Sequence, residues 1–123
     1  MTDDPSHQRE SLRAEKLIEL GQLTLRSERE GEIHTICLIG ELDLATADPV
    51  QAELERVEAT DAAAIVLDLS DLTFMDSTGV RLLVNAQARS RADSNRLTLL
   101  RGRAAVQRVL ELTGVDALLP FAD

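Results

Sequence analysis

Aromatic side chains and positive charge are both scarce in this sequence. It contains no Trp and no Tyr, its two Phe are Phe74 and Phe121, and 22 Asp and Glu against 13 Lys and Arg give a formal net charge of −9. A duplex-binding protein needs a basic surface, and a single-strand binder adds aromatic platforms on which bases stack. Nucleic acid is therefore not an expected partner. A local patch of arginines between positions 89 and 103 is the less favoured alternative.

Cysteine and histidine are equally sparse. Cys37 is the only cysteine, and His7 and His34 are the only histidines. No intrachain disulfide and no His/Cys metal cluster can form, and we expect Cys37, which lies among aliphatic residues, to be a buried thiol of a reducing compartment. The polar first ten residues lack the pattern of a signal peptide, and no apolar run approaches a membrane span. We expect a cytoplasmic protein.

Motifs of catalysis are also missing. The sequence has no P-loop, no Gly-rich dinucleotide fingerprint and no Ser-His-Asp constellation with a suitable histidine. We therefore expect that the protein is not an enzyme, has no catalytic residue, and binds no metal or cofactor.

What the chain does contain is the material for one folded domain. Its 123 residues, 44% hydrophobic and 28% charged, suit a single globular domain with a real core. Residues 1–20 are polar with a weak apolar grouping of helical type. We interpret 1–20 as an extension, a loose tail followed by a short helix that the fold does not need, and 21–123 as the domain.

Strand patterns mark three places in the domain. Apolar residues at every second position predict a β-hairpin over 22–42 that turns at Gly31. The segment 62–69 is apolar without alternation, which is typical of a central strand covered on both faces. A further strand is predicted over 97–100.

Helix patterns lie between these strands. Asp48 is expected to cap the first helix, with Pro49 at the first helical position and Gln51 closing a capping box. Further helices are predicted over about 77–92 and over 104–113, the latter ending at Gly114 as a left-handed cap before a single turn at 116–119.

The alternation of strands and helices predicts an α/β fold with a mixed β-sheet of four to five strands and about four helices, packed on one side of the central strand region. The expected core positions are apolar residues on these elements: Ile36, Leu38, Ile65, Val66, Leu67, Val80, Val84, Leu99 and Val109.

The segment 68–80 is the most informative for function, because a buried strand leads through a polar loop directly into a helix. Ser77 is expected at the start of that helix, where free backbone amides and the helix dipole accommodate a phosphate. The plainer interpretation is that Ser77, or Asp76 in its place, only caps the helix, and that Gly79 relieves crowding against the sheet rather than admitting a partner's backbone.

Three separated motifs resemble the STAS domain, and specifically the bacterial anti-sigma factor antagonists: 40–43 (GELD), 67–83 with FMDSTG at its centre, and 109–114 (VLELTG). The resemblance covers roughly residues 22 to 121 and implies a STAS-like domain. In that family the serine after the aspartate is phosphorylated by an anti-sigma factor that is also a serine kinase. The unphosphorylated form binds this kinase and releases a sigma factor.

Carried over to this sequence, the resemblance implies that Ser77 is the phosphorylation site. Asp76, Thr78 and Gly79 match the rest of its loop, and Asp43 matches a strand-end aspartate near the acceptor, so all four are expected to bind the partner. Their plainer roles are those of a turn cap for Asp43 and a helix cap for Asp76. Arg81 is a departure, because it stands where the family usually has glycine, and we count it as part of the partner surface.

The leading hypothesis is thus a phospho-switched binding module with an anti-sigma factor serine kinase as its partner and a PP2C-type phosphatase as a further partner that resets it. The alternative is a STAS protein that is never phosphorylated and serves as a scaffold subunit of a signalling assembly or a lipid-transport complex. An enzymatic function ranks last. The sequence leaves the oligomeric state open.

Overall fold

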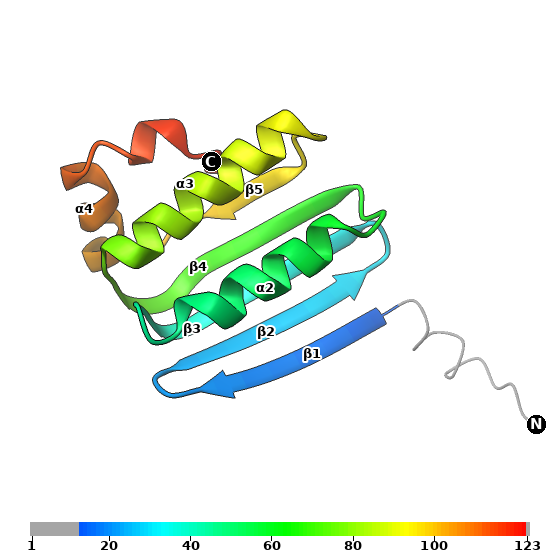
Figure 1. Cartoon of the computed structure of the whole chain (residues 1–123), viewed down its shortest axis with the longest axis horizontal. Coiled ribbons are helices and arrows are strands. Elements are labelled where there is room, and N and C mark those ends of the chain that lie inside the picture. Colours follow the sequence, from blue (N-terminus) through cyan, green and yellow to red (C-terminus); the bar gives the residue numbers. More distant parts are fainter. Residues whose placement is uncertain (1–12, 123) are drawn as a thin grey trace, which may run out of the picture.

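The computed structural model describes residues 13–122, which form one α/β domain with a five-stranded mixed sheet (Figure 1). The strand order is β1-β2-β3-β4-β5, with antiparallel pairing from β1 to β3 and parallel pairing from β3 to β5. This confirms the expected fold class, with three α-helices and one 3-10 turn in place of about four helices. The elements in chain order are β1 (Arg13–Leu20), β2 (Leu23–Glu30), β3 (Ile33–Leu42), α2 (Ala47–Glu58), β4 (Ala64–Met75), α3 (Ser77–Ala92), β5 (Leu97–Leu100), α4 (Ala104–Leu112) and the 3-10 turn η1 (Asp116–Leu118).

The first described element corrects the sequence interpretation. Residues 13–20, expected to hold a short helix, form strand β1, which pairs with β2 along its whole length. Leu17 and Ile18 are adjacent in the sequence, so their spacing alone does not distinguish a helix from a strand. Pairing with β2, which follows β1 through a tight turn at Gly21 with a φ of +56°, decides the outcome. Leu17 is exposed, whereas Ile18 packs against the core. The tail predicted before these residues lies outside the described part of the chain.

The hairpin of β2 and β3 is as predicted. Gly31 turns the chain with a φ of +63°, a conformation that favours glycine. Gly40, with a φ of +108°, marks a bulge in β3 where a Cβ would lie only 2.1 Å from the Gln22 carbonyl oxygen.

Helix α2 begins earlier than predicted. Thr46, not Asp48, is its N-cap residue, and the backbone amides of Thr46 and Ala47 both donate to the Asp43 carbonyl. Asp48 and Pro49 therefore lie in the first turn, where proline is tolerated because those amides have no helical acceptor. The expected capping box is not formed. The side of α2 that faces the core carries Val50, Leu54 and Val57, which are fully buried.

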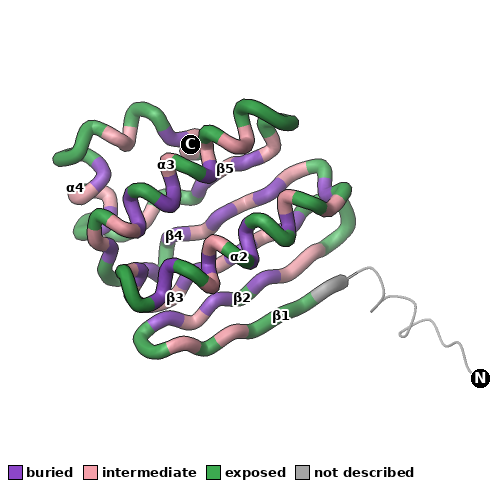
Figure 2. The backbone as a smooth tube through the Cα atoms, in the orientation of Figure 1, coloured by how far each residue is buried: buried purple, intermediate pink, exposed green. Residues whose placement is uncertain are grey.

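Strand β4 lies between β3 and β5, and Figure 1 shows α2 and α3 across one face of the sheet. Ile65, Leu67 and Leu69 are buried under the helices, whereas Val66 on the other face is only partly buried. Figure 2 shows buried and less buried positions alternating along β4. The prediction that both faces of this strand are covered is therefore wrong, and so is the burial of Val66.

The remaining elements follow the predicted order. The bounds of α3 and β5 are those expected, and α4 ends before Gly114, whose φ of +74° is left-handed. A single β-bridge joins Leu99 to Phe121 beyond the 3-10 turn. Of the predicted core, Val84 and Val109 are partly buried and pack against it, while the other positions apart from Val66 are buried.

Candidate functional site

Ser77 is the first residue of α3, directly after the end of β4. The Asp76 side chain caps the helix, because its Oδ1 accepts hydrogen bonds from the backbone amides of Thr78 at 2.9 Å and Gly79 at 3.3 Å. The sequence left both Ser77 and Asp76 open as the N-cap residue, and the structure shows that Asp76 is the cap. Ser77 is exposed, and its hydroxyl has no hydrogen-bond partner among residues 13–122.

Gly79 holds the start of α3 close to the ends of two strands. A Cβ at this position would lie 2.6 Å from Met75 Cγ and 3.1 Å from Leu42 Cδ2, closer than side chains normally approach. Gly79 is itself buried. Its place in the structure fits the packing role, and it does not face outward to meet a partner.

Asp43 lies in the loop next to the α3 N-terminus. Its backbone amide donates to Thr46 Oγ1 at 3.0 Å, and its Oδ1 accepts from the Ala45 amide at 3.0 Å. The Asp76 amide donates to the Leu42 carbonyl at 3.2 Å, which joins this loop to the capping residue. Asp43 and Asp76 are therefore brought to one end of the sheet, at the carboxyl ends of the parallel strands β3 and β4.

Arg81 and Thr78 line an open depression of about 210 Å³ between the first turns of α2 and α3. The α2 side of this depression is formed by Ala47, Asp48 and Gln51. Arg81 is exposed and has no hydrogen bond or ion pair within the described residues. The structure thus gathers the six expected site residues at one end of the domain, five of them around the Ser77 side of α3 and Asp43 in the adjoining loop.

Two exposed apolar side chains at this end were not expected from the sequence as partner contacts. Leu44 is 78% exposed in the loop after Asp43, and Phe74 is 46% exposed at the end of β4. Phe74 pairs with Glu41 of β3. It therefore lies close to the loop after β3 that contains Leu44, and the Asp76 amide holds the start of this loop through the Leu42 carbonyl. The sequence placed Phe74 in a polar loop, but β4 continues to Met75, so that expectation is wrong. The available signal was an apolar residue outside the predicted core.

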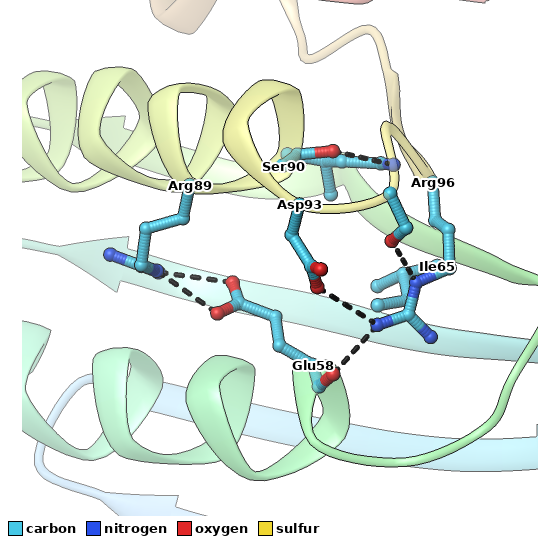
Figure 3. Close-up of a pocket in the computed structure, with 8 residues that line it drawn as sticks. Glu58, Ile65, Arg89, Ser90, Asp93 and Arg96 are labelled. Carbon is cyan, nitrogen blue, oxygen red and sulfur yellow. Dashed lines mark hydrogen bonds and ion pairs between the residues drawn. The ribbon is translucent and has the colours of Figure 1, made fainter.

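A second cavity, of about 200 Å³, lies at the opposite end of α3 (Figure 3). Arg89 donates to both carboxylate oxygens of Glu58, and Arg96 donates to the carbonyls of Glu58, Thr60 and Ala62. Arg89 therefore joins α3 to the end of α2, and Arg96 joins the start of β5 to the segment between α2 and β4, so the residues around this cavity have a structural role.

A buried polar network joins β1, β2, β3 and α2 away from Ser77. Glu53 on α2 is only 3% exposed and pairs with Arg56 at 2.6 Å and with Lys16 of β1 at 3.4 Å. Burial alone would raise the pKa of Glu53, but hydrogen bonds from Arg56 and Ser27 and the nearby cations lower it to about 2. Next to it, Ser27 Oγ lies 2.6 Å from His34 Nε2, and burial followed by the charge of Arg56 lowers the His34 pKa.

Cys37 lies on the sheet face away from the helices and is half-buried rather than fully buried. Its thiol donates to Asp68 Oδ2 at 3.7 Å, and burial, together with the Asp68 charge, raises its pKa. Within residues 13–122 no three His, Cys, Asp or Glu side chains are grouped as a metal site would require. No helix in the described range has the length and apolarity to cross a membrane.

Comparison with known proteins gives a consistent result. A family model described as the STAS domain matches residues 24–123. The chain is 29% identical over 92 residues to an anti-sigma-B factor antagonist of Listeria monocytogenes, which covers 75% of this chain and 81% of the relative.

Two solved structures illustrate the shared fold. An anti-sigma factor antagonist from Mycobacterium paratuberculosis superposes with a TM-score of 0.64 at 22% identity, covering 89% of this chain and 84% of the other. The Bacillus cell fate determinant SpoIIAA in its phosphorylated form superposes with a TM-score of 0.57 at 23% identity, covering 89% and 92%. At these identities, the likeness establishes the fold.

Proposed function

Because the chain belongs to the STAS domain family, in which its named relatives are anti-sigma factor antagonists, we propose that it is a phospho-switched anti-sigma factor antagonist. In its unphosphorylated form it binds an anti-sigma factor that is also a serine kinase, and a sigma factor is released. Phosphorylation of Ser77 ends the complex, and a PP2C-type phosphatase restores the binding form. The observation that carries this proposal is the exposed, unbonded Ser77 hydroxyl directly after the capping Asp76.

The position of Ser77 suits an acceptor of a phosphoryl group. Its oxygen can attack the γ-phosphorus of ATP held by the kinase, so that the bond to ADP breaks and the hydroxyl proton passes to a base on the kinase. Nothing in the fold has to be broken for this step, because Asp76 keeps the helix cap and Ser77 contributes none of it. The modification can therefore act as a switch without unfolding α3.

The surroundings of Ser77 suit a protein partner. Leu44 and Phe74 give exposed apolar anchors, and Asp43, Asp48 and Asp76 add carboxylates around them. Interfaces combine an apolar centre with a polar rim, and complementary charge steers the partner to it. We assign to the partner an apolar contact surface that meets Leu44 and Phe74 and leaves no room for a further negative charge at Ser77.

Charge explains how a single modification would break such a complex. Phosphoserine adds about −1.5 to −2 units near neutral pH to a region that is already acidic. An interface shaped for a neutral hydroxyl would have to desolvate or repel that charge. A loss of about 1 to 3 kcal/mol of pairing weakens binding by roughly five- to 150-fold.

The test is incubation with the cognate anti-sigma factor and ATP, followed by intact mass and by calorimetric measurement of binding. We expect wild type to gain one phosphate, Ser77→Ala to gain none and still bind, and Ser77→Asp to bind more weakly because it adds a carboxylate beside Asp76. Ser70→Ala, at an exposed serine of β4, is the matched control and should behave as wild type.

Two results would contradict the proposal. One is tight binding by Ser77→Asp, and the other is phosphate on Thr78 or Ser70 with Ser77 untouched. A protein that binds its partners but is never modified would instead fit the scaffold alternative.

A further inference from the structure

Arg81 lies one helical turn beyond Ser77 on the exposed side of α3. Side chains four residues apart on a helix are neighbours, with about 5 to 6 Å between their Cβ atoms. Helical side chains also lean toward the N-terminus, which directs the Arg81 guanidinium toward the first turn. An acidic group followed four residues later by a base is the favourable order on a helix. A negative charge placed on Ser77 would thus meet Arg81 in good geometry.

Arg81 differs from the other arginines that face α2. Arg89, on the same helix, is bound to Glu58, and Arg96 is bound to three carbonyls. Arg81 has no such partner within the described residues, and only the open depression shared with Asp48 lies beside it. Its five donors are therefore available to a new acceptor.

The helix terminus itself cannot supply all the donors that a phosphate needs. Asp76 Oδ1 already takes the amides of Thr78 and Gly79, which are the donors an anion at the start of α3 would otherwise use. A doubly charged group next to the Asp76 carboxylate needs a cation instead. The polar side chains that line the depression beside Arg81 are those of Asp48, Gln51, Thr78 and Asn85, and Arg81 is the cation among the lining residues.

We propose that Arg81 binds the phosphate of phosphorylated Ser77 within the same chain, as a two-pronged hydrogen-bonded ion pair across one turn of α3. This inference rests on the proposed function, which supplies the phosphate. It gives the switch a second effect: phosphorylation adds negative charge and also withdraws the one free cation of the described α2–α3 depression from the partner surface.

The test uses the full chain with phosphoserine placed at position 77 during translation, so that it needs neither the kinase nor the partner. The pH dependence of the phosphorus-31 chemical shift gives the pKa of the phosphate's second ionisation. We expect this pKa to be lower in the parent protein than in Arg81→Gln by about 0.3 to 0.7 unit, as expected for a helix-surface ion pair to a doubly charged acceptor. Arg81→Lys keeps the positive charge but lacks the planar guanidinium, so its phosphate pKa should lie between those of the parent protein and Arg81→Gln.

Arg91→Gln is the matched control, because Arg91 is an exposed arginine in the last turn of the same helix, and it should leave the phosphate pKa unchanged. Salt at about 1 M should reduce the difference in phosphate pKa between the parent protein and Arg81→Gln, because salt screens exposed ion pairs. Equal pKa values in these two proteins would overturn the inference while leaving the proposed switch standing. A kinase that does not modify Ser77 would end the proposed switch but not change this measurement.

Discussion

Replacing Glu53 by Gln should destabilise the fold through the buried network that joins β1 to α2. The Glu53 pKa of about 2, against an ordinary value of 4.5, corresponds to about 3 kcal/mol in favour of the charged folded form, at 1.36 kcal/mol for each pKa unit. Arg56 and Lys16, which would lose their partner, are both about half exposed and can turn to water. We therefore expect Glu53→Gln to lower the free energy of unfolding at pH 7 by about 2 to 3 kcal/mol.

The same reasoning fixes the direction of the pH dependence. The folded state lowers the pKa of Glu53, so its stabilising contribution is complete above pH 4.5 and is lost as the pH falls toward 2. The difference in stability between wild type and Glu53→Gln should shrink over that interval. Burial lowers the His34 pKa and adds its own loss of stability in acid, but both proteins share it.

Urea unfolding at several pH values, followed by far-ultraviolet circular dichroism, measures this difference, because a chain without Trp or Tyr offers little intrinsic fluorescence. Glu55→Gln, on the exposed side of the same helix, is the control and should change stability by less than about 0.5 kcal/mol. The reasoning fails if Glu53→Gln matches this control at pH 7, or if its deficit stays constant down to pH 3.

Removing residues 1–20 should lower the free energy of unfolding by about 1 to 3 kcal/mol, because the chain loses the partly buried Ile18 and the Lys16 cation beside Glu53; an unchanged melting temperature would mean that β1 contributes nothing. Asp76→Ala should cost about 0.5 to 2 kcal/mol as a lost cap, whereas Ser77→Ala should cost almost nothing, and the reverse order in chemical denaturation would show that the cap is misassigned. Gly79→Ala should destabilise by about 1 to 3 kcal/mol, since its Cβ has no room, and a stabilised variant in the same assay would refute the close packing. Leu67→Ala should cost about 2 to 5 kcal/mol in the same measurement, and a surface-like effect would contradict its central burial.

The parts of the fold that the sequence predicted are those determined locally. The bounds of α3 follow from a polar loop, a capping residue and an apolar stripe, all within one segment. The turn at Gly31 and the end of α4 at Gly114 depend on glycines with positive φ. These signals do not need a distant partner, so pattern and turn chemistry were enough.

The parts that it missed depend on which residues pair with one another, which the pattern of a single segment does not show. Strand β1 forms because β2 offers an edge and Glu53 offers an acceptor for Lys16, and neither is visible from residues 13–20 alone. Helix α2 starts at Ala47 rather than after Asp48 because the Asp43 loop captures Thr46.

The candidate site divides in the same way. Its position at Ser77 could be predicted, but the choice of cap could not, since a hydroxyl and a carboxylate can both cap a helix. The exposure of Leu44 and Phe74 depends on how the loop and the strand end are placed in three dimensions.

Strand β1 also bears on how the protein behaves in concentrated solution. It lies before the region matched by the family model, which starts at residue 24. Without β1, strand β2 would present a row of unpaired amides and carbonyls at the sheet edge, and such edges promote strand-to-strand aggregation. Strand β1 takes over that edge with a sequence that places Glu15, Lys16 and Glu19 along it, and charged edges resist further pairing. A fragment that begins at residue 24, where the family match begins, is therefore expected to self-associate. A fragment that stays monomeric should include the whole of β1 and so begin before Arg13.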